Sequence, residues 1–128
     1  MLKHNLLLLS SDLSVASRLS DEARRHGGAL AWNPSLAALL AREEAGAAAL
    51  AVIDLATGGL EIAAAVDALR ALPGKPAVVA FGPHVHEGRL AAAREAGCDA
   101  VLSRGQFHAQ LGPLVGRWLA EGPQETSA

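Results

Sequence analysis

The residues of this chain that could do chemistry follow directly after short apolar runs. Asp54 comes after seven apolar residues at 47–53. A second polar group follows the run at 6–9: Ser10, Ser11 and Asp12. An uninterrupted apolar run is typical of a strand buried on both faces of a parallel sheet. In such a sheet, ligands and reacting groups lie just past the carboxyl ends of the strands. Asp54 is therefore the first candidate site residue.

Strand-like and helix-like segments alternate along the whole chain. Short apolar segments predict five strands, at 5–9, 29–32, 47–53, 77–81 and 100–102. The segments between and after the strands carry apolar residues at helical spacing and are bounded by capping residues. For the second helix we expect Asn33 as the N-cap and Gly46 as the stop. The last three helices are expected at 60–72, 87–96 and about 106–121. Pro113 is expected either to kink the final helix or to start it.

Strict alternation of this kind predicts a single three-layer α/β domain. Parallel strands joined by right-handed crossovers need helices on both faces of the sheet. At this size the flavodoxin-like strand order 2-1-3-4-5 is expected, with five helices. That order makes the first and third strands neighbours. We therefore expect Asp54 and the polar group at 10–12 to share one crevice.

Composition limits what the domain can do. The chain has 128 residues, enough for one domain, which we place at 1–121, with a polar and disordered tail at 122–128. A net charge of −2 gives no sign of nucleic-acid binding or of a membrane surface. No apolar run approaches the roughly 18 residues of a membrane span, and the run at 6–9 is too short for a signal peptide. We therefore expect a cytoplasmic protein. The single cysteine excludes a disulfide framework and a cysteine-rich zinc site.

Three segments resemble the receiver domain of two-component response regulators, and the resemblance extends over about residues 6–119. Leu-Ala-Val-Ile-Asp-Leu at 50–55 looks like the family's third strand with its phospho-accepting aspartate, here Asp54. The segment at 91–100 resembles the family's fourth helix and the turn after it. Val-Leu-Ser-Arg at 101–104 resembles the fifth strand. The resemblance implies a non-enzymatic module that signals through protein partners, among them a histidine kinase or an effector.

The family pattern is broken where its magnesium site would be. In the family the first strand ends in an acidic pair that holds Mg²⁺, and these positions are Ser10 and Ser11. Neutral hydroxyls give up most of the charge attraction for Mg²⁺, so we expect no metal and no other cofactor. Asp12 stands one position late. Either it caps the first helix, the interpretation that we favour, or it contributes to the site.

The rest of the family's switch is also altered. The threonine or serine that bonds the phosphoryl group is replaced by Phe81 or Gly82, neither of which has a hydroxyl. Arg104 stands where the family has a lysine at the end of the fifth strand, and Gly105 replaces the proline that usually follows. We therefore expect the chain to take a different path after Arg104. Because the arginine fork suits a carboxylate, we predict a metal-free ion pair between Asp54 and Arg104.

These observations favour a pseudo-receiver that acts by protein–protein contact without Mg²⁺-dependent phosphorylation. A homodimer is possible through the face made by the fourth helix, fifth strand and fifth helix, about residues 87–119. Two alternatives stay open. One is an unusual phospho-accepting receiver modified on Asp54, with Arg104 reading the phosphate. The other is a flavodoxin-like domain that binds a small ligand or metal through Ser10, Ser11 and the nearby histidines, although His84 and His86 are more typical of a solvated loop.

Overall fold

The structure, a computed structural model, describes residues 5–121, so the tail predicted at 122–128 lies outside the described residues. Five parallel strands form one sheet in the order β2-β1-β3-β4-β5. The strands are β1 Asn5–Leu9, β2 Leu30–Asn33, β3 Ala48–Asp54, β4 Ala77–Gly82 and β5 Ala100–Ser103. The predicted fold class and strand order are confirmed.

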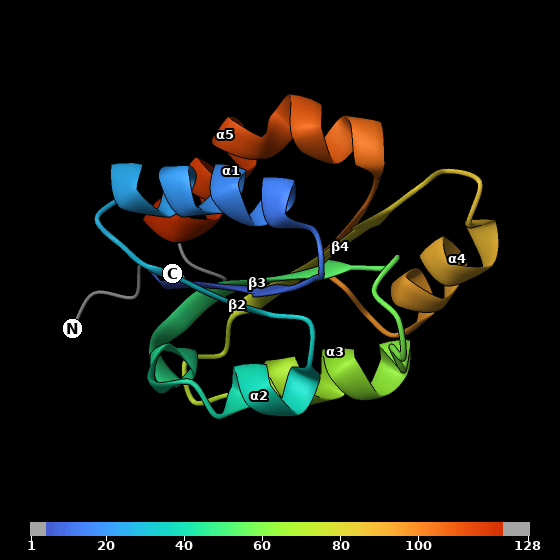
Figure 1. Cartoon of the computed structure of the whole chain (residues 1–128), viewed down its shortest axis with the longest axis horizontal. Coiled ribbons are helices and arrows are strands. Elements are labelled where there is room, and N and C mark those ends of the chain that lie inside the picture. The colour runs from blue at the N-terminus through green and yellow to red at the C-terminus, as the bar shows by residue number, and fades with distance from the viewer. Residues whose placement is uncertain (1–4, 122–128) are drawn as a thin grey trace.

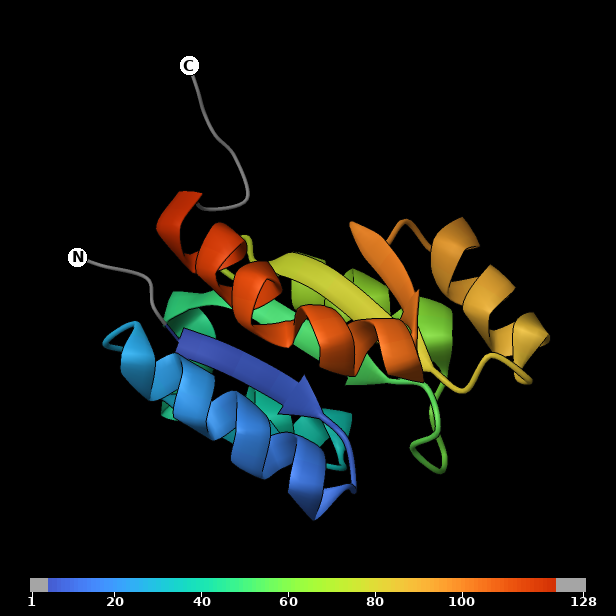
Figure 2. The ribbon, with the colours of Figure 1, turned by 90° about the horizontal axis from the view of Figure 1, so that it is seen from above.

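Helices cover both faces of the sheet (Figure 1). They are α1 Leu13–Arg25, α2 Leu36–Leu40, α3 Ile62–Arg70, α4 Glu87–Glu95 and α5 Arg104–Glu121, with a 3₁₀-helix, η1, at Glu43–Ala47. α1 and α5 lie on one face, and Figure 2 shows β1 running between them when that face is seen from above. α2, α3 and α4 cover the other face. No helix in the described part of the chain is long and apolar enough to cross a membrane.

The core is divided by the sheet into two apolar layers. Every residue of β3 and β4 is buried, which explains why these strands are continuous apolar runs without alternation. Alternate side chains of each strand enter opposite layers, so that Val52 packs towards α1 and α5 while Ile53 packs towards α3. The carboxyl ends of the strands meet at one edge, where Asp54 pairs in register with Phe81.

The second helix differs from its prediction. Asn33 still pairs with Leu9 in the sheet, so it cannot be the helix cap. Its side chain instead accepts a hydrogen bond from the Ser35 N–H at 2.9 Å, and the Ser35 hydroxyl caps α2 by accepting from Ala38 N–H at 3.3 Å. The α-helix ends at Leu40 rather than at Gly46, because the chain tightens into η1 before β3.

The last helix begins earlier than predicted and is continuous. Arg104 is its first residue, and Pro113 lies inside it. The start is fixed by a reciprocal pair of bonds: the Ser103 hydroxyl accepts from Gln106 N–H at 3.1 Å, and the Gln106 side chain accepts from Ser103 N–H at 2.9 Å. This capping box lets α5 follow β5 without a loop.

Candidate functional site

Asp54 is the last residue of β3, and its carboxylate is buried and fully engaged. The residue is 2% exposed. Its Oδ2 accepts a hydrogen bond from the Ser10 hydroxyl at 2.7 Å, and its Oδ1 accepts from the Ala56 N–H at 3.0 Å. These two hydrogen bonds offset part of the desolvation cost of burying the carboxylate. Ser10 and Asp54, which were expected to lie close together, are therefore in direct contact.

Ser10 is held in place from three sides. It is completely buried. Its hydroxyl oxygen accepts from the Asp12 N–H at 3.0 Å, and its carbonyl accepts from the Trp32 Nε1–H at 2.6 Å. Because the hydroxyl has a single proton and gives it to Asp54, its orientation is fixed. Ser11 is exposed, and no hydrogen bond of its side chain occurs among the described residues.

Asp12 caps α1, as the favoured alternative predicted. Its Oδ1 accepts from Ser14 N–H at 2.9 Å and from the Ser14 hydroxyl at 2.8 Å, and more weakly from Val15 N–H at 3.4 Å. The hydrogen bond from the Ser14 hydroxyl is the main cause that lowers the pKa of Asp12, burial opposes it, and the Val15 amide and Arg104 add to the lowering. The carboxylate is thus stabilised in its charged form as a helix cap.

The predicted ion pair between Asp54 and Arg104 is wrong. The Arg104 guanidinium donates instead to Oδ2 of Asp12. Asp54 is already satisfied by Ser10 and Ala56, whereas the Asp12 side chain is 28% exposed and can be reached by a side chain that is itself 36% exposed. Arg104 also lies across the Phe81 ring, with its guanidinium carbon 5.7 Å from the ring centroid. The pair is half exposed, so we expect it to contribute little stability.

Phe81 occupies the position next to Asp54 on β4. The ring is completely buried and stacks on Phe107 of α5, with centroids 4.1 Å apart and planes 8° from parallel. The Phe81 carbonyl accepts from Leu55 N–H at 2.8 Å, which ties the end of β3 to β4. Gly82 lies against Leu55, since a Cβ added at Gly82 would be 3.1 Å from the Leu55 Cβ. Neither position offers a polar side chain to Asp54.

Solved structures provide the comparison for this geometry, because no family model matches the sequence and no curated protein matches it. The BeF3-activated DrrB receiver domain superposes with a TM-score of 0.75 at 16% identity, over 94% of this chain and 100% of that one. A signal receiver domain from Bermanella marisrubri gives 0.71 at 16%, over 91% and 98%. The receiver domain of a Pseudomonas aeruginosa sensor histidine kinase, which has a magnesium ion in its active-site cleft, gives 0.68 at 15%, over 91% and 98%. The chain has the fold of a receiver domain.

Within the receiver fold, the short loop after β3 closes over Asp54. Thr57 is buried and donates from its N–H to the Asp54 carbonyl at 3.0 Å, while its hydroxyl donates to the Leu9 carbonyl at 3.4 Å. Arg89 of α4 donates to the Leu55 carbonyl at 2.6 Å. Sequence reasoning missed both residues. No pattern marks Arg89, because its partner is a backbone carbonyl 34 residues away.

Among the described residues, no histidine forms a hydrogen bond with Asp54 or Ser10. His84 and His86 are exposed in the loop before α4. His108, on the first part of α5, lies edge-on to Phe107 with ring centroids 5.5 Å apart and is bonded to Arg18 of α1. Within residues 5–121, no three side chains of His, Cys, Asp or Glu are grouped so that they could hold a metal ion.

The surroundings of His108 predict that the domain's stability depends on pH. Its Nδ1 lies 2.7 Å from the Arg18 guanidinium, which can only donate, so Nδ1 is an unprotonated acceptor. Burial, then Arg18 and then Arg104, lower the pKa of His108 below 6.5, and Asp12 opposes them. Below about pH 6.5 the unfolded chain therefore binds more protons at this residue than the folded one. The free energy of unfolding is expected to fall as the pH drops through that range.

This dependence is measured by urea unfolding at pH 7, 6 and 5. A His108→Gln variant keeps an acceptor for Arg18 and should show a flatter profile than the wild type. His84→Gln, at an exposed position, is the matched control and should leave the profile unchanged. Equal slopes for the wild type and His108→Gln would contradict the assignment.

Proposed function

We propose that this chain is an atypical receiver, a pseudo-receiver in two-component-type signalling, that acts by protein–protein contact without Mg²⁺-dependent phosphorylation. One observation carries the proposal: both carboxylate oxygens of Asp54 accept hydrogen bonds while the residue is 2% exposed. A phosphodonor has to approach this carboxylate, and here the carboxylate faces the protein rather than solvent. Its role is then structural.

The donor set at the crevice does not fit a magnesium ion. Mg²⁺ prefers near-octahedral oxygen ligation with carboxylates and water in the shell. Of the two carboxylates near the ends of β1 and β3, Asp54 is bonded to Ser10 and Asp12 is bonded to Ser14 and Arg104. A cation would have to replace the hydrogen bond from the Ser10 hydroxyl to Asp54. It would also compete for Asp12 with the permanently charged guanidinium of Arg104. We therefore propose that the domain has no metal cofactor and no enzymatic activity.

The proposed partners are proteins: a histidine kinase, an effector, or a second copy that pairs through α4, β5 and α5, all in the cytoplasm. The exposed segment before α4 supports a contact surface there. Val85 is 70% exposed, one of the two large apolar side chains with high exposure in the described part of the chain. Exposed residues continue into the first turn of α4. A surface of this kind can work without a phosphorylation switch.

The test is intact mass after incubation with Mg²⁺ and acetyl phosphate. We expect no phosphoryl adduct on the wild type, while a conventional receiver with an acidic pair, treated in parallel, shows one. Asp54→Asn keeps an acceptor for the Ser10 hydroxyl and serves as the folded control. An adduct on the wild type that disappears in Asp54→Asn would refute the proposal and establish the phospho-accepting alternative.

A further inference from the structure

The edge strand β2 leaves half of its backbone groups without a strand partner. Within residues 5–121, β2 pairs only with β1. The Ala29 carbonyl accepts from the N–H of Leu6, in β1, at 2.9 Å. The Asn33 carbonyl accepts from the N–H of Ser10, directly after β1, at 3.4 Å. Because the direction of backbone groups alternates along a strand, the N–H and C=O of Leu30 and Trp32 point away from β1. Such an edge is a template for one more strand.

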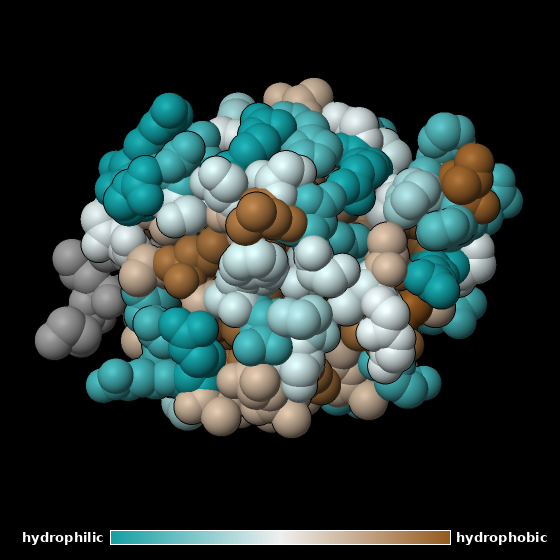
Figure 3. Space-filling view, in the orientation of Figure 1, coloured by the Kyte–Doolittle hydropathy of each residue, from teal (hydrophilic) through white to brown (hydrophobic). Residues whose placement is uncertain are grey.

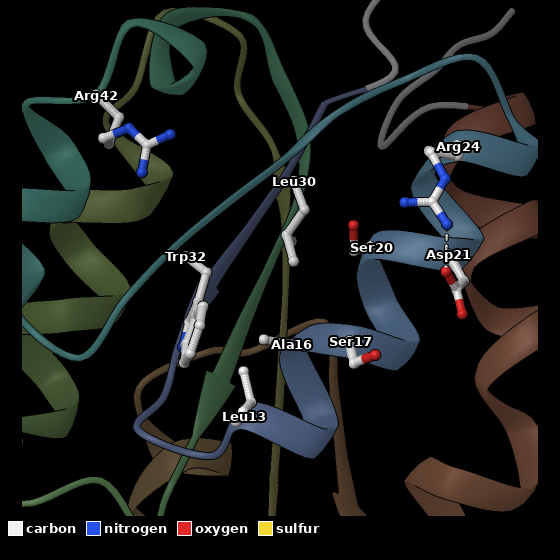
Figure 4. A pocket seen from close by; sticks show the side chains of 9 residues that line it. All are labelled: Leu13, Ala16, Ser17, Ser20, Asp21, Arg24, Leu30, Trp32 and Arg42. Carbon is white, nitrogen blue, oxygen red and sulfur yellow. Dashed lines mark hydrogen bonds and ion pairs between the residues drawn. The ribbon is translucent and has the colours of Figure 1, made fainter.

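A trough of about 580 Å³ runs above this edge, between β2 and α1. Leu13 and Trp32 lie at one end, and Leu30 lies further along (Figure 4). Leu13 is 69% exposed, and Figure 3 shows apolar surface interrupting the polar surface on this side of the molecule. The Trp32 ring is fixed by its bond to the Ser10 carbonyl, so the trough is formed in advance. It is open along its length and would leave a small ligand largely in water, whereas small-ligand sites enclose most of their ligand.

The other end of the trough contains two arginines. Arg24 and Arg42 lie there, on opposite sides of Leu30 (Figure 4). Asp21 is the single acid among the lining residues, and it pairs with Arg24 at 2.5 Å. Arg42 forms an ion pair with Glu44 at 3.4 Å. Among the described residues this is the one side-chain bond of Arg42, so most of its five N–H donors can still donate to an incoming group. The unused donors of the Arg42 guanidinium suit a carboxylate, which would compete with Glu44 for them.

We propose that β2 and this trough bind an extended peptide segment of a partner protein, which adds a sixth strand at the sheet edge. Antiparallel pairing with Leu30 and Trp32 is the more stable choice. One apolar side chain of the peptide then lies beside Trp32 and Leu13. Side chains two residues apart share a face and are separated by about 7 Å, so an acidic residue two positions later reaches Arg42 and Arg24. The recognised pattern is apolar-x-acidic.

This interaction does not depend on whether Asp54 is phosphorylated. Its test can therefore fail or succeed independently of the test of the proposed function. It lies on the opposite edge of the sheet from β5, and so differs from the α4, β5 and α5 surface. Trp32 connects the trough to the surroundings of Asp54. Its ring N–H donates to the Ser10 carbonyl, and the Ser10 hydroxyl donates to Asp54.

The test is an NMR titration of the ¹⁵N-labelled full chain with the capped peptide Thr-Leu-Thr-Glu-Thr. We expect saturable shifts and slowed hydrogen exchange at the amides of Leu30 and Trp32. A peptide with lysine in place of glutamate should bind about tenfold more weakly, the loss of one charge-assisted hydrogen bond. The reversed peptide Thr-Glu-Thr-Leu-Thr should also bind more weakly, because it places its acid at the apolar end.

Two protein variants give the matched comparison. Arg42→Glu should weaken binding of the glutamate peptide about tenfold and favour the lysine peptide, while Arg94→Glu, on exposed α4, should change neither. Leu30→Pro removes a donor that faces the open edge and should abolish binding in a protein whose remaining spectrum is intact. Shifts that are absent at millimolar peptide, or insensitive to Arg42→Glu, would overturn the proposal. Concentration-dependent shifts at β2 without peptide would show that a second copy occupies the edge, and would overturn it as well.

Discussion

Replacing Phe81 by threonine, the residue type that receivers carry near this point, is expected to lower the free energy of unfolding by about 3–5 kcal/mol. The ring is completely buried and stacks on Phe107 at 4.1 Å, so the substitution removes a large apolar group and leaves a cavity. It also places a hydroxyl in an apolar layer, and it removes the stacking contribution of about 1 kcal/mol. Domains of this size are stable by only about 5–15 kcal/mol, so the loss is a large fraction of the total.

Urea unfolding with an unchanged slope measures this loss. Phe81→Leu keeps most of the apolar volume and should cost clearly less than Phe81→Thr, while Val85→Thr, at a 70% exposed position, should stay within about 0.5 kcal/mol of the wild type. If Phe81→Thr cost less than about 1 kcal/mol, the ring would not be the core element that the structure shows. A large cost means that the hydroxyl position cannot be restored without rebuilding the contact between β4 and α5.

The meeting of Ser10 with Asp54 could be predicted because it depends only on topology. The apolar runs at 6–9 and 47–53 both end at a polar residue, and the strand order makes β1 and β3 neighbours. Two residues at the ends of neighbouring parallel strands are then close, whatever their side chains do. The start of α5 could have been predicted in the same way, because Ser103 and Gln106 have the spacing of a capping box. That signal was present in the sequence and was not used.

The partner of Arg104 could not be predicted, because it depends on which carboxylate is still available. From the sequence, Asp12 and Asp54 are both acids near the carboxyl ends of strands. In the structure, Asp54 accepts hydrogen bonds from Ser10 and Ala56 and is shielded from solvent. Asp12 remains partly exposed at the N-cap of α1. The long and flexible Arg104 side chain pairs with the carboxylate that it can contact without being buried itself. Side-chain burial, which decides this choice, is a property of the packed fold rather than of the pattern.

Ser10→Ala is the second substitution with a large expected effect, because it removes a hydrogen bond from a buried charge. The hydroxyl donates to Asp54 at 2.7 Å and accepts from the Asp12 N–H at 3.0 Å. Hydrogen bonds to charged groups contribute about 1.5–3 kcal/mol, and a buried group left unsatisfied costs its desolvation. We expect the free energy of unfolding to fall by about 2–3 kcal/mol. Ser11→Ala is the matched control one residue away, and since Ser11 is exposed it should change stability by less than about 0.5 kcal/mol.

A double-mutant cycle with Asp54→Asn identifies the source of the Ser10 effect. Asparagine keeps an acceptor but removes the charge, so Ser10→Ala should cost about 1 kcal/mol less in the Asp54→Asn background than in the wild type. Equal costs in the two backgrounds would mean that Ser10 acts through the α1 cap at Asp12 and not through Asp54. A clear coupling would show that the Asp54 side chain is stabilised by a serine, in the position where the family carries an acid. The serine at the position of the family's acid would then be the residue that stabilises the buried aspartate.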